Sequence, residues 1–504
     1  MASLLATLDE CLRANLLPDA SVRAAAELRV QQLRSEPGFA SCLLQLALQQ
    51  DGSVEVRQLA AVVLKHFVHA DWSRVAEAER AAVRAALPAG LRDGHGRIRT
   101  AVSVVIAGVA KTDWPEAWPT LLEDLMQPLE AAGAGPDTVA GVLRCLEICA
   151  AELSAEHMRP ALQRLLPKLL EVFCDEAGQH DRRTRARAVK VLYNLFKRVS
   201  MMCDDRRLLQ QLQRGPLAGW VGAILRELAT PLAAYDDCSV AIAALRLLQL
   251  LSEQAPLALK PHAESLLPPL GTAMLGAVRA HEAMLARGAD DADDDAGGAC
   301  DSDGGLLGLA ALSAQLFDNL AALGASSKWC KLLLPSLGEV FYAAVAFLQV
   351  APAAEAEWGA DLAQYLEDED ADTFAVSTRV AAQQLCYELL DCYGRKALVP
   401  LCGAAQRRLA DADAAGGAAT AAGWRLREAT WLLLSIGAET LCDSARRQHA
   451  GGAPMLVDIH AVANTKEQEI PLETGELSKR LRFGVPDPAH APSFKFLDAG
   501  KHPL

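Results

Sequence analysis

Apolar residues in the first part of the chain recur with the period of amphipathic helices. Between residues 4 and 17 they lie at positions 4, 5, 8, 12 and 16, which form one side of a helix. Leu17-Pro18-Asp19 ends this segment, and Asp is a residue type that caps the first turn of a following helix. The pattern predicts helices over 4–17, 19–35, 39–49, 54–68, 76–91 and 98–110, and similar hairpins to about residue 445.

The second helix of each hairpin begins with a recurring pattern, in which a branched residue precedes an Arg and small residues follow. The Arg lies at Arg23, Arg57 and Arg99, with spacings of 34 and 42 residues, and Thr378-Arg379-Val380 repeats the pattern later. We expect each Arg to bridge to acids or helix ends of the neighbouring repeat. Two helices in about 40 residues are typical of HEAT repeats. We therefore predict an all-α fold, a HEAT-repeat α-solenoid that forms a right-handed superhelix of antiparallel helical hairpins.

The segment Lys111–Leu122 separates two apolar helical segments and contains residues typical of a corner. We expect Asp113 to cap a new helix, with Glu116 three residues later completing a capping box. The prolines at positions 115 and 119 suit a first helical turn, where no N–H is needed. The tryptophans at positions 114 and 118 are four residues apart, so we expect both indoles on one helix face.

Composition supports a helical protein with basic partners. Of 504 residues, 51% are hydrophobic and only 5% aromatic, and the scarcity of Thr, Ile and Tyr argues against a sheet. The net charge of −14 disfavours nucleic acid as the main partner. The 13 Cys lack paired spacing, which indicates free thiols in a reducing compartment. The N-terminus resembles no signal peptide and no apolar run reaches membrane-spanning length, so we expect a soluble intracellular protein.

Two acidic linkers interrupt the helical pattern, at residues 288–305 and 351–371. We expect both to be solvated loops, with the binding of a basic partner or mere solubility as the open alternatives. The aspartates at 291, 293 and 295 lack the Gly and Glu of a calcium loop, so we predict no metal site there. Beyond residue 451 the helical period fades, and we predict a disordered tail over 451–504.

The most basic stretch of the chain is 181–190. Arg183, Arg187 and Lys190 fall on one side of the predicted helix. No aromatic residues alternate with these cations as they do in many nucleic-acid sites. We therefore interpret this face as solvated or as the contact for an acidic protein surface.

Several motifs resemble the importin-β family of nuclear transport receptors, the karyopherins. Val56–His66 resembles the hallmark of their N-terminal domain, and Trp114–Pro119 resembles a hairpin corner of these receptors. Tyr365–Phe374, followed by Arg379–Ala382, resembles an acidic loop and helix near the middle of the family. The likeness covers about residues 3–445 and does not extend to the tail. Because family members are roughly twice as long, the chain resembles a C-terminally shortened member.

The resemblance implies a non-enzymatic import receptor that shuttles between cytoplasm and nucleus. Residues 1–112 then form the N-terminal domain that binds Ran-GTP, and residues 113–450 form further repeats. Expected partners are Ran-GTP, basic cargo such as histones and ribosomal proteins, and Phe-Gly nucleoporins of the nuclear pore. No catalytic residue, metal, cofactor, direct nucleic-acid contact or membrane insertion is implied.

The resemblance also assigns candidate site residues. The residues expected to contact Ran are Arg57, Gln58, Lys65, His66 and Arg99. The residues expected to contact basic cargo are Glu367, Asp368, Glu369, Asp370 and Asp372. Two alternatives remain open: the Ran candidates as ordinary solenoid surface, and the whole chain as a HEAT scaffold or chaperone subunit without Ran dependence.

Overall fold

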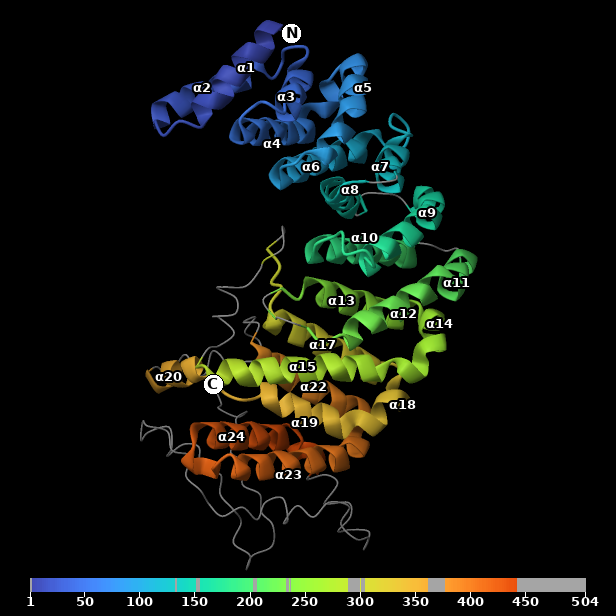
Figure 1. Ribbon diagram of the computed structural model, residues 1–504, viewed down its shortest axis with the longest axis vertical. Helices are drawn as coiled ribbons and strands as arrows, with labels where there is room; N and C mark the ends of the chain where they lie inside the picture. Colours follow the sequence, from blue (N-terminus) through green and yellow to red (C-terminus); the bar gives the residue numbers. More distant parts are fainter. Residues whose placement is uncertain are drawn as a thin grey trace, which may run out of the picture. The chain divides into compact units, whose positions relative to one another are not determined.

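The computed structural model describes residues 2–131, 134–150, 155–202, 206–232, 235, 237–288, 300, 304–360 and 377–441. Its regular structure is helical (Figure 1), and within the described residues the one β-bridge joins Cys300 to Leu306. The prediction of an all-α protein is therefore confirmed. The acids Glu367–Asp372 and the tail 451–504 lie outside the described residues.

The helices follow the predicted segments closely in the first hairpins, and Asp19 caps the second helix as expected, accepting from the N–H groups of Ser21 and Val22. The α-helices are α1 (Ala2–Asn15), α2 (Ala20–Leu33), α3 (Phe39–Leu48), α4 (Val54–Asp71), α5 (Glu77–Ala86), α6 (Gly96–Asp113), α7 (Leu121–Glu130), α8 (Pro136–Cys149), α9 (Ala155–Cys174), α10 (Arg182–Met202), α11 (Arg206–Arg214), α12 (Pro216–Ala229), α13 (Ser239–Gln254), α14 (Pro256–Leu259), α15 (Leu267–Ala286), α17 (Leu309–Ala325), α18 (Cys330–Leu333), α19 (Leu337–Phe347), α20 (Pro352–Ala360), α22 (Thr378–Tyr393), α23 (Leu398–Ala414) and α24 (Ala421–Ile436). The short 3₁₀ helices are η1 (Trp72–Arg74), η2 (Leu87–Arg92), η3 (Lys260–Ser265), η4 (Leu334–Ser336), η5 (Gly394–Ala397) and η6 (Gly417–Ala419).

The chain forms two compact units, whose boundary falls within α12. Unit 1 comprises Met1–Ala223 with Gln254–Ala258, and unit 2 comprises Ile224–Glu253 with Leu259–Leu504. Neither unit coincides with the predicted Ran-binding segment 1–112, which stays a prediction about function.

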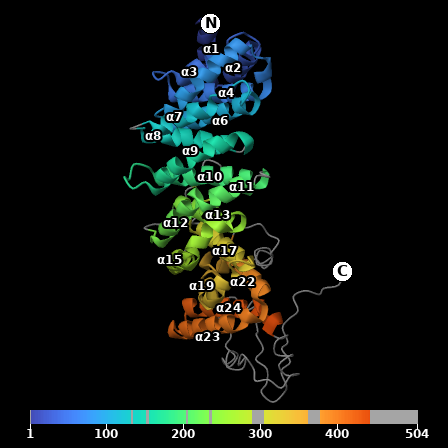
Figure 2. The ribbon, with the colours of Figure 1, turned by 90° about the vertical axis from the view of Figure 1, so that its right-hand side faces the viewer.

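Each unit is built from two layers of helices. In unit 1 the second helices of the hairpins, α4, α6, α8 and α10, pack each against the next, and the first helices lie on one side of them (Figure 1, Figure 2). In unit 2, α15, α19 and α23 pack in the same way beside α17, α22 and α24. The apolar stripe of each helix is thus buried against neighbouring hairpins, as a repeat array requires.

The recurring Arg binds a carbonyl near the end of the first helix of its own hairpin, and in Arg57, Arg99 and Arg379 it also pairs with an acid of the next hairpin, as predicted. The side chain of Arg57 is 1% exposed, and its Nε donates to the carbonyl of Ala47 at 3.1 Å in α3. The same guanidinium forms an ion pair with Asp93, which follows η2 in the next hairpin. In the first hairpin Arg23 donates to the carbonyl of Leu17 at 3.0 Å, just beyond α1. The Arg therefore satisfies a carbonyl at the end of a first helix, which has no partner within that helix.

The same arrangement recurs in α6 and α22. Arg99 forms an ion pair of 2.8 Å with Asp137 of the following hairpin. Arg379 donates to the carbonyl of Leu348 and pairs with Glu428 in the next hairpin at 2.8 Å. Buried cations are tolerated because each is both paired and hydrogen-bonded.

Small residues allow the close approach of these hairpins, and Gly141 of α8 is the sharpest case. A Cβ at this position would overlap the carbonyl oxygen of Leu91 in η2. Because the overlap is with backbone, it cannot be relieved by a side-chain rotation.

We expect Gly141→Ala to destabilise unit 1 by about 1–3 kcal/mol, since overpacking outweighs the gain in helix propensity. Gly271→Ala in α15 is the matched control, because a Cβ there meets nothing within 4 Å. That control should be neutral or stabilising by up to about 1 kcal/mol. Thermal unfolding of both variants measures the difference, and equal melting temperatures would contradict the overlap.

The capping box predicted at Asp113 is wrong. Asp113 is the last residue of α6 and is buried, where it accepts a hydrogen bond of 3.0 Å from Trp72 Nε1 and pairs with Arg84. Glu116 is exposed, and the next helix begins only at Leu121. The carboxylate binds two buried donors instead, Trp72 after α4 in the preceding hairpin and Arg84 of α5 in the same hairpin, because leaving either unsatisfied would cost more than a lost cap.

The two tryptophans of this corner do not share a helix face, because the segment between α6 and α7 is not helical. Trp118 is buried, and its Nε1 donates to Asp124 of α7 at 3.0 Å, whereas Trp114 is half-buried. Pro115 and Pro119 both precede α7 rather than forming its first turn. The corner is therefore built by side-chain contacts and not by helix capping.

The second predicted linker, 351–371, begins with a helix, which corrects its interpretation as a loop. Trp358 of α20 packs with Val350 and Trp424. The guanidinium of Arg379 lies over the Trp358 ring, 5.9 Å from its centroid. This aromatic contact orders the residues that precede the acidic motif.

In the described part of the chain, one stretch, Cys330–Phe347, is long and apolar enough to cross a membrane by length and composition alone, with a mean hydropathy of 1.4 over 18 residues. Half of it is buried inside the protein. It comprises α18, η4 and α19, and α19 packs against α15, α22 and α23. These contacts are those of a core helix.

Candidate functional site

The side of α4 that faces away from the hairpin core forms one stripe at the spacing of one helix face. Its exposed members are Glu55, His66 and His69, and its half-buried members are Gln58, Leu59 and Val62. The opposite side carries Val56, Ala60, Leu64 and Phe67, all buried against the hairpin core. The burial pattern thus separates a surface available to partners from the packing face.

The structure brings three of the five Ran candidates together. Gln58 and Lys65 are half-buried and two turns apart at the edge of the exposed stripe, and His66 beside them is exposed. Arg57 instead points into the core, where Asp93 and Ala47 hold it. The side chain of Arg99 is 14% exposed and bound to Asp137. Arg57 and Arg99 therefore act in packing between hairpins.

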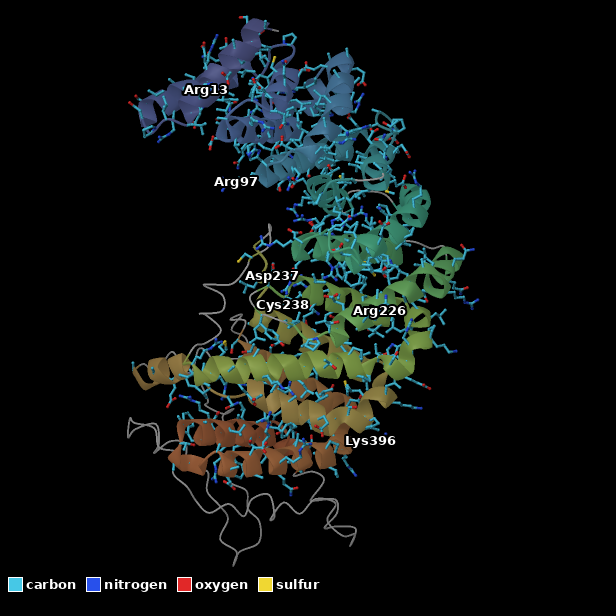
Figure 3. The ribbon with its side chains drawn as sticks, viewed as in Figure 1. Arg13, Arg97, Arg226, Asp237, Cys238 and Lys396 are labelled. Atoms are coloured by element: carbon cyan, nitrogen blue, oxygen red, sulfur yellow. The ribbon has the colours of Figure 1, made fainter. Side chains whose placement is uncertain are left out.

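Residues of α6 extend this surface, and sequence reasoning missed them. Arg97 and Lys111 are exposed at the two ends of α6, which packs directly against α4. Arg97 extends from the ribbon at the beginning of the helix (Figure 3). Between them Val104 is half-buried on the same face. The spacing of 14 residues, about four helical turns, was the signal in the sequence.

The second helix of the first hairpin, α2, has one exposed large apolar side chain. Leu28 is 62% exposed, while only Ala26, Val30 and Leu33 of this helix are buried. Leu28 thus adds one exposed apolar side chain to the surface of the second helices. We define the second-helix surface as Leu28, Gln58, Lys65, His66, Arg97 and Lys111.

Asp93 connects this surface to the core beneath it. Burial raises the pKa of the Asp93 carboxyl, but hydrogen bonds from the His95 N–H, Gln50 and Arg57 outweigh it, so the pKa lies below its ordinary value. The carboxylate is therefore ionised and locks the turn before α6. This turn positions Arg97 at the start of the helix.

Among the described residues no group of three or more His, Cys, Asp or Glu is placed to hold a metal ion. Burial raises the pKa of Cys386 to about 12 and that of Cys402 to about 11, so both stay as thiols.

Comparison with known families finds two matches in the N-terminal part of the chain. Residues 26–93 match the importin-beta N-terminal domain, and residues 96–179 match the exportin 1-like protein family. The first match contains α4 and η2, and the second begins with α6.

Sequence similarity to individual proteins extends further along the chain than the two family matches. The chain is 21% identical to Importin-9 of Drosophila melanogaster over 428 residues, which are 82% of this chain and 41% of the relative. It is 33% identical to Importin-11 of Homo sapiens over 117 residues, 22% of this chain and 12% of the relative. The chain thus spans less than half the length of these relatives.

Solved structures share the fold. The exportin Cse1 in its cargo-free, cytoplasmic state matches with a TM-score of 0.59 and 13% identity, covering 86% of this chain and 46% of that one. Kap95 in its complex with Nup1 matches with a TM-score of 0.58 and 15% sequence identity, and the match covers 92% of this chain and 49% of that one. Kap121p bound to RanGTP matches with a TM-score of 0.55 and 18% sequence identity, and the match covers 92% of this chain and 38% of that one. These similarities confirm the predicted class of packed HEAT repeats.

Proposed function

We propose that the chain is a nuclear transport receptor of the importin-β family of karyopherins, which binds Ran-GTP and carries protein cargo through the nuclear pore. Members of this family are transport receptors without enzymatic activity. The observation that carries the proposal is the match of the importin-beta N-terminal domain to 26–93, the segment that presents the exposed stripe of α4.

The second-helix surface is the proposed Ran contact. Kap121p, which shares the fold, has been solved bound to RanGTP. On this chain, His66 is exposed on α4 with Gln58 and Lys65 half-buried next to it, and Arg97 and Lys111 are exposed on α6, which packs against α4. Adjacent cations on a rigid pair of helices suit fast, charge-steered association with an acidic partner surface.

The proposed cargo is basic protein, such as histones and ribosomal proteins, and the proposed contacts at the pore are Phe-Gly nucleoporins. The net charge of −14 supports basic cargo, and the acids Glu367–Asp370 with Asp372 are the proposed contact. Kap95, solved with Nup1, supports the nucleoporin contact by its shared fold. Transport implies shuttling between cytoplasm and nucleus.

The alternative, a HEAT scaffold or chaperone subunit without Ran dependence, shares the fold and differs in nucleotide sensitivity. Titration calorimetry with Ran loaded with GTP or GDP separates the two functions. A receptor binds the GTP form more tightly, whereas a scaffold binds neither form.

We expect Lys65→Glu to weaken binding of Ran-GTP about tenfold, because it reverses one charge at the centre of the second-helix surface. Lys396→Glu is the matched control, with the same charge change at an exposed residue of η5 in unit 2. The control should bind Ran-GTP as the parent does. Equal affinities of the two variants would place the Ran contact elsewhere.

A further inference from the structure

Two consecutive corners of unit 2, where the chain passes from a second helix to the next first helix, are held in place by aromatic side chains. Between α17 and α19, Trp329 Nε1 donates to the carbonyl of Ser252 near the end of α13 at 3.3 Å. Between α22 and α23, the hydroxyl of Tyr393 donates to the carbonyl of Cys330 at 2.7 Å. Because both donors bind backbone of the neighbouring hairpin, the two corners lie side by side along one edge of unit 2.

Four cations of these corners are not used in packing. Lys328 and Lys331 belong to the first corner, Arg395 and Lys396 belong to the second, and all four are exposed. Within the described residues, none of their side chains forms an ion pair or a hydrogen bond. The aromatic contact between the corners brings the two pairs together, since Lys331 and Arg395 lie within two residues of its ends. Lys396 lies at the same edge of unit 2 as α18 (Figure 1, Figure 3). We call these four residues the corner cations.

The basic stretch at 181–190 differs from this edge, because the packing of α10 uses two of its cations. Arg185 Nε donates to the carbonyl of Phe173 at 2.8 Å, and the Arg185 guanidinium lies over the Phe173 ring. Arg187 pairs with Glu147 of α8 at 3.2 Å. Arg187, a member of the predicted cationic face, therefore contributes to packing between hairpins.

A pocket of about 420 Å³ lies beside the first corner, at the ends of α13 and α17. Its lining includes Ser252, Glu253, Ala325, Ser326, Ser327 and Lys328. Within the described part of the chain, the hydroxyls of Ser326 and Ser327 form no hydrogen bond, so both are available to donate to a ligand. The pocket thus presents one cation, two available hydroxyls and one carboxylate.

We propose that the corner cations and this pocket bind an acidic polypeptide segment of a protein partner, with one carboxylate of that segment in the pocket. Lys328 and the two serine hydroxyls hold this carboxylate, and the other corner cations attract the acids next to it. The corner cations outnumber the exposed acids of these corners, which are Glu253 and Asp391. Glu253 repels a second negative charge in the pocket, so the pocket accepts a single carboxylate.

Nucleic acid fits this surface less well than a peptide. Single-stranded nucleic acid is held by aromatic side chains on which bases stack. Trp329 is 6% exposed and Tyr393 is half-buried, and both donate hydrogen bonds within the fold. The net charge of −14 also repels a long polyanion more than it repels a short run of carboxylates.

This surface goes beyond the proposed Ran contact, since it lies in unit 2 and outside 26–93. The test uses the full chain and a fluorescent peptide of about ten glutamates, with affinity measured by anisotropy across a salt series. The variant carries Lys328→Glu, Lys331→Glu, Arg395→Glu and Lys396→Glu. We expect its affinity for the peptide to fall by about tenfold or more, with the salt dependence of binding reduced, because attraction becomes repulsion.

The matched control carries Arg92→Glu, Arg214→Glu, Arg226→Glu and Arg287→Glu, which change the net charge by the same amount at exposed positions. Figure 3 shows the position of Arg226 on α12. The control should bind the peptide within about threefold of the parent. Equal losses in both variants would mean that only net charge matters, and this would overturn the proposal.

The pocket is tested without a change of charge by Ala325→Phe, at the exposed last residue of α17. The added ring occupies the pocket, so we expect about three- to tenfold weaker binding of the peptide, as for the loss of one hydrogen bond. Ala286→Phe, at the exposed last residue of α15, is the control and should bind as the parent does. Equal affinities of Ala325→Phe and the parent would contradict a carboxylate in the pocket.

Further measurements keep the result specific. Circular dichroism of every variant verifies the helical fold, and Lys328→Gln, Lys331→Gln, Arg395→Gln and Lys396→Gln together should also weaken binding, since they remove the charge without reversing it. An oligothymidylate of equal charge should bind more weakly than the peptide, and tighter binding would overturn the proposal in favour of nucleic acid. Ran-GTP binding, measured in parallel, should be unchanged by these substitutions, so failure here is distinguishable from failure of the proposed receptor function.

Discussion

Replacing Arg57 by Ala is expected to lower the free energy of unfolding of unit 1 by about 3–5 kcal/mol. Arg57 is 1% exposed, and it alone connects the Ala47 carbonyl to the carboxylate of Asp93. Removing it leaves a buried anion whose remaining donors are the His95 N–H and Gln50. The loss is large because the partner charge stays in the interior.

Hydrogen exchange of the full chain measures the loss of stability in the helices next to Arg57. Amides of α3, α4 and α6 should lose protection about a hundredfold or more, since about 1.4 kcal/mol corresponds to tenfold. Arg29→Ala on α2 is the control, because Arg29 is exposed, and its effect should stay within about 0.5 kcal/mol. Unchanged protection near Asp93 in Arg57→Ala would show that the ion pair does not hold these hairpins together.

The same ion pair makes unit 1 sensitive to acid. Because the folded pKa of Asp93 lies below the unfolded value of about 3.9, its stabilisation is complete above that pH and is lost as pH falls through the folded pKa. In Arg57→Ala this part of the acid sensitivity should diminish, since one of the groups that lower the pKa is gone.

Asp113→Ala is also expected to lower the free energy of unfolding of unit 1 by about 3–5 kcal/mol. The substitution leaves the Trp72 indole N–H without its buried acceptor and removes one of the acids that pair with Arg84. Glu77 still pairs with Arg84 but lies near the surface, so it replaces only part of the lost interaction.

Urea unfolding followed by tryptophan fluorescence measures this loss, because Trp72, Trp114 and Trp118 all lie in unit 1. Glu116→Ala is the control: under a capping-box role it would destabilise the corner as much as a lost cap, about 1 kcal/mol. The structure predicts almost no effect for Glu116→Ala, since this side chain is exposed. If Glu116→Ala proved as costly as Asp113→Ala, the buried role of Asp113 would be refuted.

The sequence by itself determined the local features of this protein. The apolar period located the early helices to within a few residues, because an amphipathic helix must bury one face whatever its neighbours are. Asp19 was recognised as a cap since its partners, Ser21 and Val22, are adjacent in the chain. The recurring Arg was recognised because repeats place equivalent residues in equivalent contacts.

The candidate surface was predictable only in part. The motif Val56–His66 located the right helix, and the helical period placed Gln58, Lys65 and His66 near one another. The period did not distinguish Arg57, because an Arg is ordinarily a surface residue and its buried partner lies 36 positions away. Similarly, Arg97 joined the surface only once α6 was seen to pack on α4.

Only the tertiary structure decided which partner each buried polar group takes. Asp113 has the sequence context of a cap, yet its donors come from 29 and 41 residues earlier in the chain. Residues 352–360 have the composition of a linker, yet the contact of Trp358 with Trp424 accompanies a helix there. In both cases a buried contact distant in sequence outweighs a local preference of about 1 kcal/mol, because an unsatisfied buried group or an exposed indole costs more.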